Sequence, residues 1–343
     1  RSHDLEREID LIEEIARLIG YDNFQATLPQ PIRPGALNIK QSKERELRRS
    51  LVNSGIQEIT TISLVHEKEN NINQIKLKNP LFTDTSCLRD SLWENHLEIC
   101  KTNLSSGKLG CWIFEIGSTY EKQNNKIKEK RQLAGVISGE RRNEKWTTSG
   151  KIKNLNYYEA KGVLERSFKL INISFNFLEL KDNKYLHPGR SSSIQLEGQI
   201  IGVFGQIHPK IYSEQNIHKE TYIFEIDIDK VLTAASRKNN TNPLFKQFPL
   251  VPTIERDLSI KSKNYIPSLD ICSLIRKTGK PLLENVEIID RYEGKSEIDE
   301  FISQTFRITY RDKNKTLEEK DIIEVHQKIR NIVCEKFKCE LRS

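Results

Sequence analysis

Apolar and polar residues alternate along much of the stretch from Leu186 to Ile228. The alternation runs on both sides of Gly198, which is the period-two pattern of an antiparallel hairpin that turns at this glycine. After Pro209 and a short helical piece, the segment from Tyr222 to Ile228 has the pattern of a third strand. Strands this apolar must be covered, so we expect them at the centre of a buried sheet.

The preceding part of the chain mixes helical and strand periodicities. Apolar residues at helical spacing predict helices over residues 4–20, 42–53, 91–104 and 157–171. Alternating or short apolar runs predict strands over residues 58–65, 75–78, 111–120, 132–138 and 174–180. Polar, basic loops are expected at residues 121–131 and 140–154. An antiparallel sheet that alternates with a few helices is an α+β domain, which we place at residues 40–232.

The last part of the chain predicts a second α+β unit. Strands are expected at residues 256–261, 283–292, 301–310 and 338–341, and helices at residues 268–278 and 318–334. The order βαββαβ is that of the split βαβ, ferredoxin-like sandwich. Two helices would cover one face of its sheet and leave the other face open. We place this unit at residues 246–342.

Two stretches are expected to connect the domains. Residues 29–39 contain three prolines, through which a helix cannot continue, and residues 233–245 are polar without periodicity. Residues 1–28 then form a separate N-terminal segment.

Composition narrows the class of protein. The 343 residues are 36% hydrophobic and 30% charged, with no apolar run near the roughly 20 residues of a membrane span and no signal-peptide core. The six scattered cysteines are expected to be free thiols in a reducing compartment, so we expect a cytoplasmic protein without membrane contact. A net charge of +7 permits a polyanionic partner. Because methionine is absent, residue 1 is not a translation start, and we expect a piece of a longer protein.

The N-terminal helix carries a candidate metal site. Asp10, Glu13 and Glu14 lie at i, i+3 and i+4, and Asp4 stands at the start of the segment. Carboxylate oxygens are ligands that Mg2+ prefers. The alternative is an acidic helix face that is simply solvated, and spacing alone does not decide between the two.

Catalytic motifs are missing from the sequence. It contains no phosphate-cradling Gly-x-x-x-x-Gly-Lys, no Gly-x-Gly-x-x-Gly, no His-Glu-x-x-His and no Gly-x-Ser-x-Gly. His96 falls on the apolar stripe of its helix, where a packed core histidine is expected. We assign no catalytic residue.

The open face of the expected sandwich is the best candidate binding surface. Asp290 and Tyr292 share one side of their strand because side chains alternate. Ser303 belongs to one parity class of the next strand, together with Thr305 and Arg307. A tyrosine beside hydrogen-bonding groups on an exposed sheet is a common way to stack and read single-stranded RNA bases. The alternative is a solvent-facing sheet without a ligand.

Short motifs follow one another in a specific order over essentially the whole chain. They include Asp10-Leu11-Ile12-Glu13-Glu14, Asn79-Pro80-Leu81, Leu88-Arg89, Phe114-Glu115-Ile116-Gly117, Ala160-Lys161-Gly162, His187-Pro188-Gly189-Arg190, Gly205-Gln206-Ile207-His208-Pro209, Arg256-Asp257-Leu258, Asp290-x-Tyr292 and Glu340-Leu341-Arg342. In this order they resemble the beta-subunit family of bacterial phenylalanyl-tRNA synthetases.

The resemblance implies a fold and a function. Residues 1–28 would end a metal-binding (B5-type) domain, residues 40–232 would be a class II synthetase-like domain without catalysis, and residues 246–342 would be a ferredoxin-fold anticodon-binding domain. The alpha subunit would attach phenylalanine to tRNA(Phe) with ATP, while this chain holds an alpha2beta2 heterotetramer together. The N-terminal half of the subunit, with its editing site, would be missing. In agreement with lost catalysis, residues 201–206 contain no arginine that could hold ATP.

The resemblance also assigns site residues. Asp4, Asp10, Glu13 and Glu14 fall on the family's Mg2+ positions, shared with the alpha subunit. For the anticodon, Tyr292 would stack on the base, Asp290 would read its edge, and Ser303 would lie beside them. The chain departs from the family pattern after Lys295-Ser296, where extra polar residues follow. The rival functions are a free-standing RNA-binding module and a structural subunit that never touches RNA.

Overall fold

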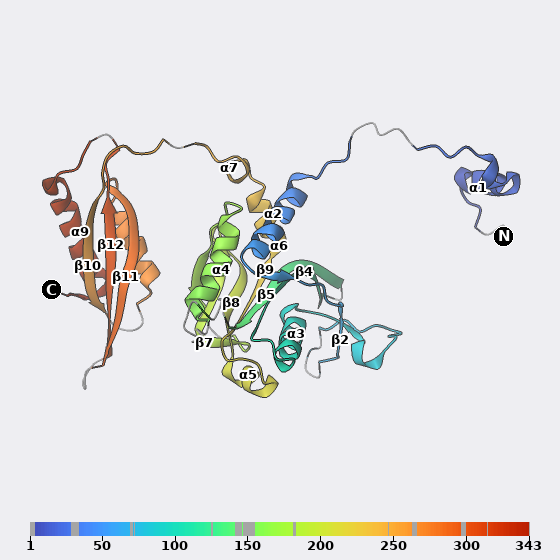
Figure 1. Ribbon diagram of the computed structural model, residues 1–343, viewed down its shortest axis with the longest axis horizontal. Coiled ribbons are helices and arrows are strands. Elements are labelled where there is room, and N and C mark those ends of the chain that lie inside the picture. Colours follow the sequence, from blue (N-terminus) through green and yellow to red (C-terminus); the bar gives the residue numbers. More distant parts are fainter. Residues whose placement is uncertain are drawn as a thin grey trace. The chain divides into compact units, whose positions relative to one another are not determined.

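The computed structural model divides the chain into two units, Arg1–Leu244 and Phe245–Ser343 (Figure 1). The structure describes residues 4–28, 34–68, 71, 73–124, 126–140, 146, 155–180, 183–245, 247–262, 266–295, 300–313 and 315–342. Most of the loop expected at residues 140–154, the start of the connector at 29–33, and residues 296–299 lie outside this set. The predicted fold class, α+β, is confirmed in both units.

A seven-stranded sheet dominates the first unit, in the order β1-β4-β5-β9-β8-β7-β6. Its strands are β1 Gln57–Glu58, β4 Gly110–Gln123, β5 Lys126–Gly139, β6 Asn176–Glu179, β7 Leu186–Leu196, β8 Gln199–Ile207 and β9 Thr221–Asp227. β1 runs parallel to β4, and the other neighbours are antiparallel. The predicted antiparallel sheet is therefore confirmed, with one short parallel edge strand.

The hairpin predicted around Gly198 is also confirmed. β7 and β8 pair up to Leu196 and Gln199, and the two turn residues, Glu197 and Gly198, have φ angles of 50° and 83°. Positive φ at both central positions suits a tight hairpin turn, and glycine adopts it without steric cost. β8 and β9 then lie side by side inside the sheet, as their apolar composition requires.

Helices cover both faces of this sheet. α2 (Ile39–Asn53), α4 (Tyr157–Lys169) and α6 (Ile228–Ala235) pack on one face, against a core that includes Phe114 and Phe224. α3 (Trp93–Ser105) packs on the other, against the neighbouring Ile113 and Ile223. Because consecutive strand residues point to opposite faces, each strand supplies both cores.

Several elements differ from the sequence prediction. The loop expected at residues 121–131 is instead the continuation of β4 and β5, which pair until Gln123 faces Lys126. The strand expected at residues 58–65 is two short pieces, β1 and β2 (Leu64–Val65), and β2 pairs with β3 (Cys87–Leu88). The strand expected at residues 75–78 is reduced to one bridge between Lys76 and Cys87. Polar ribbons exposed on both faces lose the apolar alternation on which strand prediction depends.

The stretch that follows β9 is more helical than expected, because two helices extend into the linker predicted at residues 233–245. The side chain of Asp227 accepts a hydrogen bond from the backbone N–H of Lys230 and caps α6, which runs on to Ala235. A short helix, α7, covers Lys238–Thr241. α5 (Pro209–Gln215) is the helical piece expected after Pro209.

The second unit has the strand order β11-β12-β10-β13, which confirms the ferredoxin-like sandwich. Its elements are β10 Ile254–Ser262, α8 Ser268–Thr278, β11 Leu283–Lys295, β12 Glu300–Tyr310, α9 Glu319–Phe337 and β13 Glu340–Leu341. Both helices contribute to one core with the sheet, in which Phe306 and Ile308 are fully buried. The opposite face of the sheet carries no helix among the described residues.

The N-terminal segment forms the predicted helix, α1 (Glu8–Ile19). It ends at Gly20, whose φ of 94° lies in the region that favours glycine. Neither α1 nor the 3-10 turn Tyr21–Asn23 after it contains a buried residue. Among the described residues, no helix is long and apolar enough to cross a membrane.

Candidate nucleic-acid interface

The open face of the four-stranded sheet brings the predicted anticodon residues together. β11 and β12 pair so that Tyr292 faces Ser303 and Asp290 faces Thr305. Residues directly opposite each other in an antiparallel pair share one face. All three predicted residues therefore lie on the open face, on adjacent strands.

A β-bulge maintains this arrangement. Ile288 pairs with Phe306 on the core side, and the next pair is Asp290 with Thr305, so Ile289 has no partner of its own. β11 therefore contains one extra residue that has no partner in β12, which is a β-bulge. The bulge keeps Asp290 and Tyr292 on the open face while Ile288 stays on the core side.

The sequence analysis gave no role to Arg342, which connects two of these residues. Its Nη1 donates a hydrogen bond to Ser303 Oγ at 3.3 Å, and its guanidinium lies 5.9 Å from the centroid of the Tyr292 ring. Ser303 is only 2% exposed, whereas Tyr292 is 54% exposed. The tyrosine ring is thus presented to solvent while the serine hydroxyl is covered. The closing Glu340-Leu341-Arg342 motif was the signal that could have indicated this residue.

Other groups on the open face are aromatic or charged. Lys261 Nζ lies 4.0 Å from the centroid of the Phe301 ring, beside Ser303. Farther along, Arg307 Nε and Asp257 Oδ1 form a 3.0 Å ion pair, and the hydrogen bond from Arg307 lowers the pKa of Asp257. An exposed sheet with two aromatic rings and several cations is suited to stacked bases and phosphates.

The four predicted metal ligands on and before the acidic helix do not converge on one point. Asp10 accepts hydrogen bonds from the backbone N–H of Arg7 at 2.8 Å and from its guanidinium at 3.0 Å, which lower its pKa. Glu14 pairs with Arg17 at 2.6 Å, and Asp4 and Glu13 are exposed. The structure shows no group of three or more potential ligands within the residues that it describes. The oxygen donors suit Mg2+ in chemistry, but this chain by itself does not gather them around one point.

The large sheet contains a buried ionic network that connects two of the sequence motifs. Arg89 Nη2 lies 3.0 Å from Glu115 Oε1, and both side chains are less than 5% exposed. Thr61 Oγ1 donates to Glu115 Oε2 at 2.6 Å, and His96 Nε2 lies 3.2 Å from the same oxygen. A carboxylate can only accept, so His96 Nε2 carries the proton. The expected core histidine is therefore confirmed, with an acidic partner.

These partners determine the charge of Glu115. Burial alone would raise its pKa, but hydrogen bonds from His96 and Thr61 and the charge of Arg89 outweigh burial and lower the pKa to about 2. Gly117 leaves room for the network, because a Cβ at this position would lie 2.5 Å from Arg89 Nη2. The motif residues Arg89, Glu115 and Gly117 thus form a structural unit.

The pKa of a second carboxyl group, Glu225 on β9, is raised, whereas that of Glu115 is lowered. Burial raises its pKa to about 7, the nearby carboxylates of Asp90 and Glu94 act in the same direction, and the N–H of Leu92, which donates at 3.0 Å, opposes them. The group lines a polar cavity of about 340 Å³. Lys68 Nζ pairs with the carboxylates of Asp90 and Glu94, each at 2.7 Å. The sequence gave no signal for Glu225, since its neighbours come from residues 68–94.

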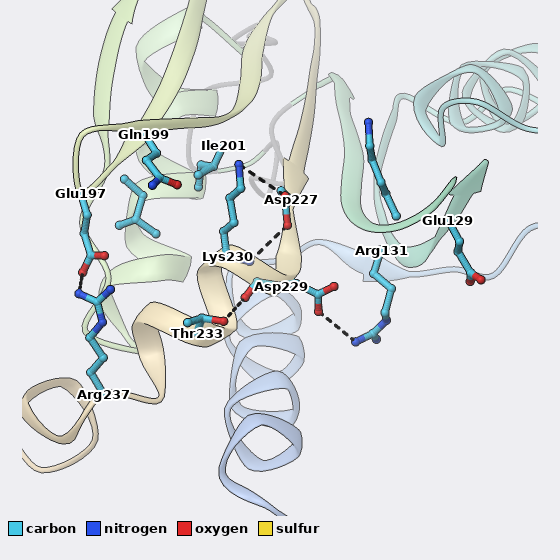
Figure 2. Close-up of a pocket in the computed structure, with 12 residues that line it drawn as sticks. Glu129, Arg131, Glu197, Gln199, Ile201, Asp227, Asp229, Lys230, Thr233 and Arg237 are labelled. Atoms are coloured by element: carbon cyan, nitrogen blue, oxygen red, sulfur yellow. Dashed lines mark hydrogen bonds and ion pairs between the residues drawn. The ribbon is translucent and has the colours of Figure 1, made fainter. Parts of the chain in front are cut away.

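A third candidate is the pocket of about 470 Å³ drawn in Figure 2. Its charged groups neutralise one another: Lys230 pairs with Asp227 at 3.7 Å, and Arg131 with Asp229 at 3.9 Å. Arg237 likewise pairs with Glu197. Three cations of this pocket are thus paired with acidic residues that line the same pocket.

The glycines of β8 serve strand packing. A Cβ on Gly202 would lie 2.2 Å from the carbonyl oxygen of Glu225 on the neighbouring strand. His187 and Arg190 have local partners: His187 Nδ1 accepts from the N–H of Gly189 at 3.0 Å, and Arg190 donates to Gln206 at 3.1 Å. The described residues on these strands therefore assemble no phosphate-holding loop.

Comparisons with known proteins agree with the resemblance. Residues 25–228 match the family model of the phenylalanyl tRNA synthetase beta chain CLM domain, and residues 249–342 match that of the ferredoxin-fold anticodon binding domain. The whole chain is 49% identical to the phenylalanine–tRNA ligase beta subunit of Prochlorococcus marinus strain NATL2A and 45% identical to that of Synechococcus sp. strain CC9902. It spans 42% of the length of each of these relatives.

A solved structure, pyrrolysyl-tRNA synthetase from Desulfitobacterium hafniense, aligns over 57% of this chain and 68% of its own chain. The TM-score of this alignment is 0.43 and the sequence identity 14%.

Proposed function

Because the chain belongs to the phenylalanyl-tRNA synthetase beta-chain family, we propose that it supports the ATP-dependent attachment of phenylalanine to tRNA(Phe). Its role is to bind the tRNA anticodon and to hold the catalytic alpha subunit in an alpha2beta2 assembly. The observation that carries this proposal is the alignment of Asp290, Tyr292 and Ser303 on one open sheet face, within a stretch that matches an anticodon-binding family.

On the open face, different side chains would contact the flat face and the edge of a base. The exposed ring of Tyr292 stacks on the base, since every base has a π face. The exposed carboxylate of Asp290 accepts hydrogen bonds from the base edge and so selects among bases. Arg342 lies beside the ring and donates a hydrogen bond to Ser303, so it helps to position both residues.

The first unit serves as the scaffold for the alpha subunit. The carboxylate of Glu115 is engaged in the internal network with Arg89 and Thr61 rather than aimed at a ligand. Attachment of phenylalanine is therefore assigned to the alpha subunit, which uses the ATP. The domain division follows the resemblance, with the segment 1–28 completing a metal-binding domain from the longer protein.

We place Mg2+ at the boundary of the two subunits, with Asp4, Asp10, Glu13 and Glu14 as the carboxylates of this chain. The ion would complete its octahedral shell with waters and groups of the partner, because α1 alone does not gather three ligands. A cytoplasmic location fits the six free cysteines, five of which are buried.

The first experiment replaces Tyr292 by Ala in the full beta subunit assembled with its alpha subunit. Loss of one stacking ring should weaken tRNA(Phe) binding by about 1–3 kcal/mol. Titration of a labelled transcript against the ligase measures this change. Tyr158→Ala is the matched control, because Tyr158 is 70% exposed and lies in the first unit. If Tyr292→Ala binds as tightly as the unaltered ligase, the anticodon site is wrong and the structural-subunit alternative stands.

Co-purification with the alpha subunit of the same genome, with and without Mg2+, tests the scaffold role. A complex that charges tRNA only when both chains are present is the expected outcome. A chain that binds tRNA but never the alpha subunit would instead be a free-standing RNA-binding module.

A further inference from the structure

The β4–β5 hairpin extends beyond the sheet as a basic arm, which we define as residues 119–124 and 126–131. Its two strands remain paired from Thr119 with Lys130 to Gln123 with Lys126. β9 pairs with β5 only from Gln132 onward, so the outer edge of β5 has no strand partner along the arm among the described residues. The arm is a two-stranded ribbon in which residues 121–124 and 126–130 are all exposed, and on one face Lys128 and Lys130 border the polar cavity that Glu225 lines.

The arm has an excess of positive charge. It carries Lys122, Lys126, Lys128, Lys130 and Arg131 against two glutamates, Glu121 and Glu129. These side chains give the arm a net charge of +3. A concentrated positive charge on a projecting ribbon attracts polyanions.

Only two of the five cations are neutralised by described partners. Lys130 pairs with Glu121 at 3.2 Å, and Arg131 is held by Glu44 at 3.0 Å. None of Lys122, Lys126 and Lys128 forms an ion pair with a described residue, although Glu121 lies opposite Lys128 across the ribbon. Because Lys is a flexible point charge with three donors, these three side chains are available to phosphate oxygens.

The positions of the three lysines suit a nucleic-acid backbone. Lys126 and Lys128 alternate along β5, so they lie on one face of the ribbon, about 7 Å apart. Lys122 faces Ile127 across the ribbon and lies on the other face. Neither face has an aromatic cluster that could read a base, so contacts here would be with phosphates and would not depend on sequence.

We propose that this basic arm is a second RNA-binding surface, which contacts the phosphate backbone of the tRNA that the chain binds. The proposal rests on the proposed function of tRNA binding. The arm and the open face of the second unit then divide the work: the arm supplies sequence-independent affinity, and the open face reads the anticodon. The rival explanation is that the lysines only protect the free edge of β5 from pairing with other strands.

The experiment uses the ligase assembled from full-length subunits and the double variant Lys126→Gln/Lys128→Gln. Binding is measured with two unmodified transcripts, tRNA(Phe) and a tRNA with another anticodon, at 50 and 200 mM salt. Two lost phosphate contacts should reduce the fall in affinity between these salt concentrations by about tenfold, because each contact adds about 0.9 to the salt slope. Both transcripts should be affected equally.

Two further variants make the result specific. Lys101→Gln/Lys108→Gln removes the same charge from exposed positions elsewhere in the first unit and should leave the salt dependence unchanged. Lys126→Arg/Lys128→Arg keeps the charge and should restore binding. Neither pair belongs to the anticodon site.

The outcomes separate this proposal from the proposed function. If the glutamine variant binds both transcripts with the original salt dependence, the arm does not contact RNA, and aggregation of that variant would then identify edge protection. An equal loss in the Lys101/Lys108 control would also overturn the proposal, since the effect would be one of total charge. If the unaltered ligase binds neither transcript, the proposed function itself fails.

Discussion

The two sheets of this protein differ in how many of their faces are covered. The seven-stranded sheet has helices on both faces, and its motif residues Arg89 and Glu115 are less than 5% exposed. The four-stranded sheet is covered on one face only, and its ion pair between Asp257 and Arg307 is 42% exposed on each side. Both pairs have nitrogen and oxygen atoms 3.0 Å apart, so the difference lies in solvent, not in geometry.

This difference agrees with the proposed division between a scaffold sheet and a binding sheet. In the covered sheet a charge must be matched by the protein itself, because water cannot solvate it. Every partner of Glu115 is therefore fixed, and none is free to meet a ligand. On the open sheet, water solvates unpaired groups at little cost, so Asp290 and Tyr292 can remain exposed without a protein partner.

The largest expected change in stability comes from breaking the buried ion pair between Arg89 and Glu115. Glu115→Ala leaves the guanidinium of Arg89 buried without its anion, which should lower the free energy of unfolding by about 3–5 kcal/mol. Chemical denaturation followed by tryptophan fluorescence is specific to the first unit, because Trp93, Trp112 and Trp146 all lie there.

The double variant Arg89→Met/Glu115→Leu serves as its control. Removal of both charges should recover much of the lost stability, since apolar side chains replace a buried pair at little cost. A Glu115→Ala protein as stable as the unaltered one would contradict the assignment of this network as structural.

The second effect concerns Glu225 and depends on pH. Its pKa of about 7 in the folded chain lies above the unfolded value of 4.5, so the folded state binds more protons between these pH values. Stability from this group is present below about pH 4.5 and is lost as pH rises to about 7. Glu225→Gln should therefore stabilise the first unit by up to about 2 kcal/mol at pH 8.

Denaturation curves at pH 5 and pH 8 measure the Glu225 effect. The difference between variant and unaltered chain should shrink towards pH 5. Glu115→Gln should instead destabilise the first unit. The low pKa of Glu115 gives stability above pH 4.5 that is lost towards pH 2. A gain for Glu225→Gln that did not change with pH would show that this carboxyl is ionised throughout.

A smaller effect is expected for Arg342 on the open sheet. Arg342→Gln removes a cation at 5.9 Å from the Tyr292 ring, a contact of about 0.5–1 kcal/mol at an exposed site. Binding of tRNA(Phe) to the assembled ligase should weaken by about twofold to fivefold. In a Tyr292→Ala background the same substitution should have less effect, and a full effect there would mean that Arg342 acts on RNA independently of the ring.

The smallest effect is expected for the exposed pair. Arg307→Gln should leave the protection of the β10 and β12 amides against hydrogen exchange unchanged, because water replaces the ion pair. A clear loss of protection would show that the open face is stabilised by its charges, and the contrast between the two sheets would then be one of degree.

Sequence patterns predicted the parts of this fold that have one face in an apolar core. The hairpin around Gly198 and the βαββαβ order both follow from alternation and periodicity. The basic arm was missed because a ribbon solvated on both faces has no apolar alternation. Helix α6 was missed although Ile228, Val231, Leu232 and Ala235 recur at helical spacing, because the strand was expected to run to Ile228 and a linker to begin at residue 233.

The site residues divide along similar lines. Parity placed Asp290 and Tyr292 on one side of their strand and the resemblance added Ser303, and the structure brings the three together on one face. Arg342 could not, because its contact with Ser303 spans 39 residues and depends on the position of β13. The network of Glu115 and the raised pKa of Glu225 depend on partners up to 133 residues away, which a local pattern does not contain.

The bulge at Ile289 means that β11 contains one residue more than its pairing with β12 requires. Deletion of Ile289 would straighten the strand and still leave Asp290 and Tyr292 facing outward, since Asp290 would then follow Ile288 in regular alternation. Deletion of Arg291, two positions later, would turn Tyr292 towards the helices. Tolerance of length changes along this strand is therefore expected to be asymmetric: a deletion before Asp290 keeps Asp290 and Tyr292 on the open face, and a deletion after Asp290 does not.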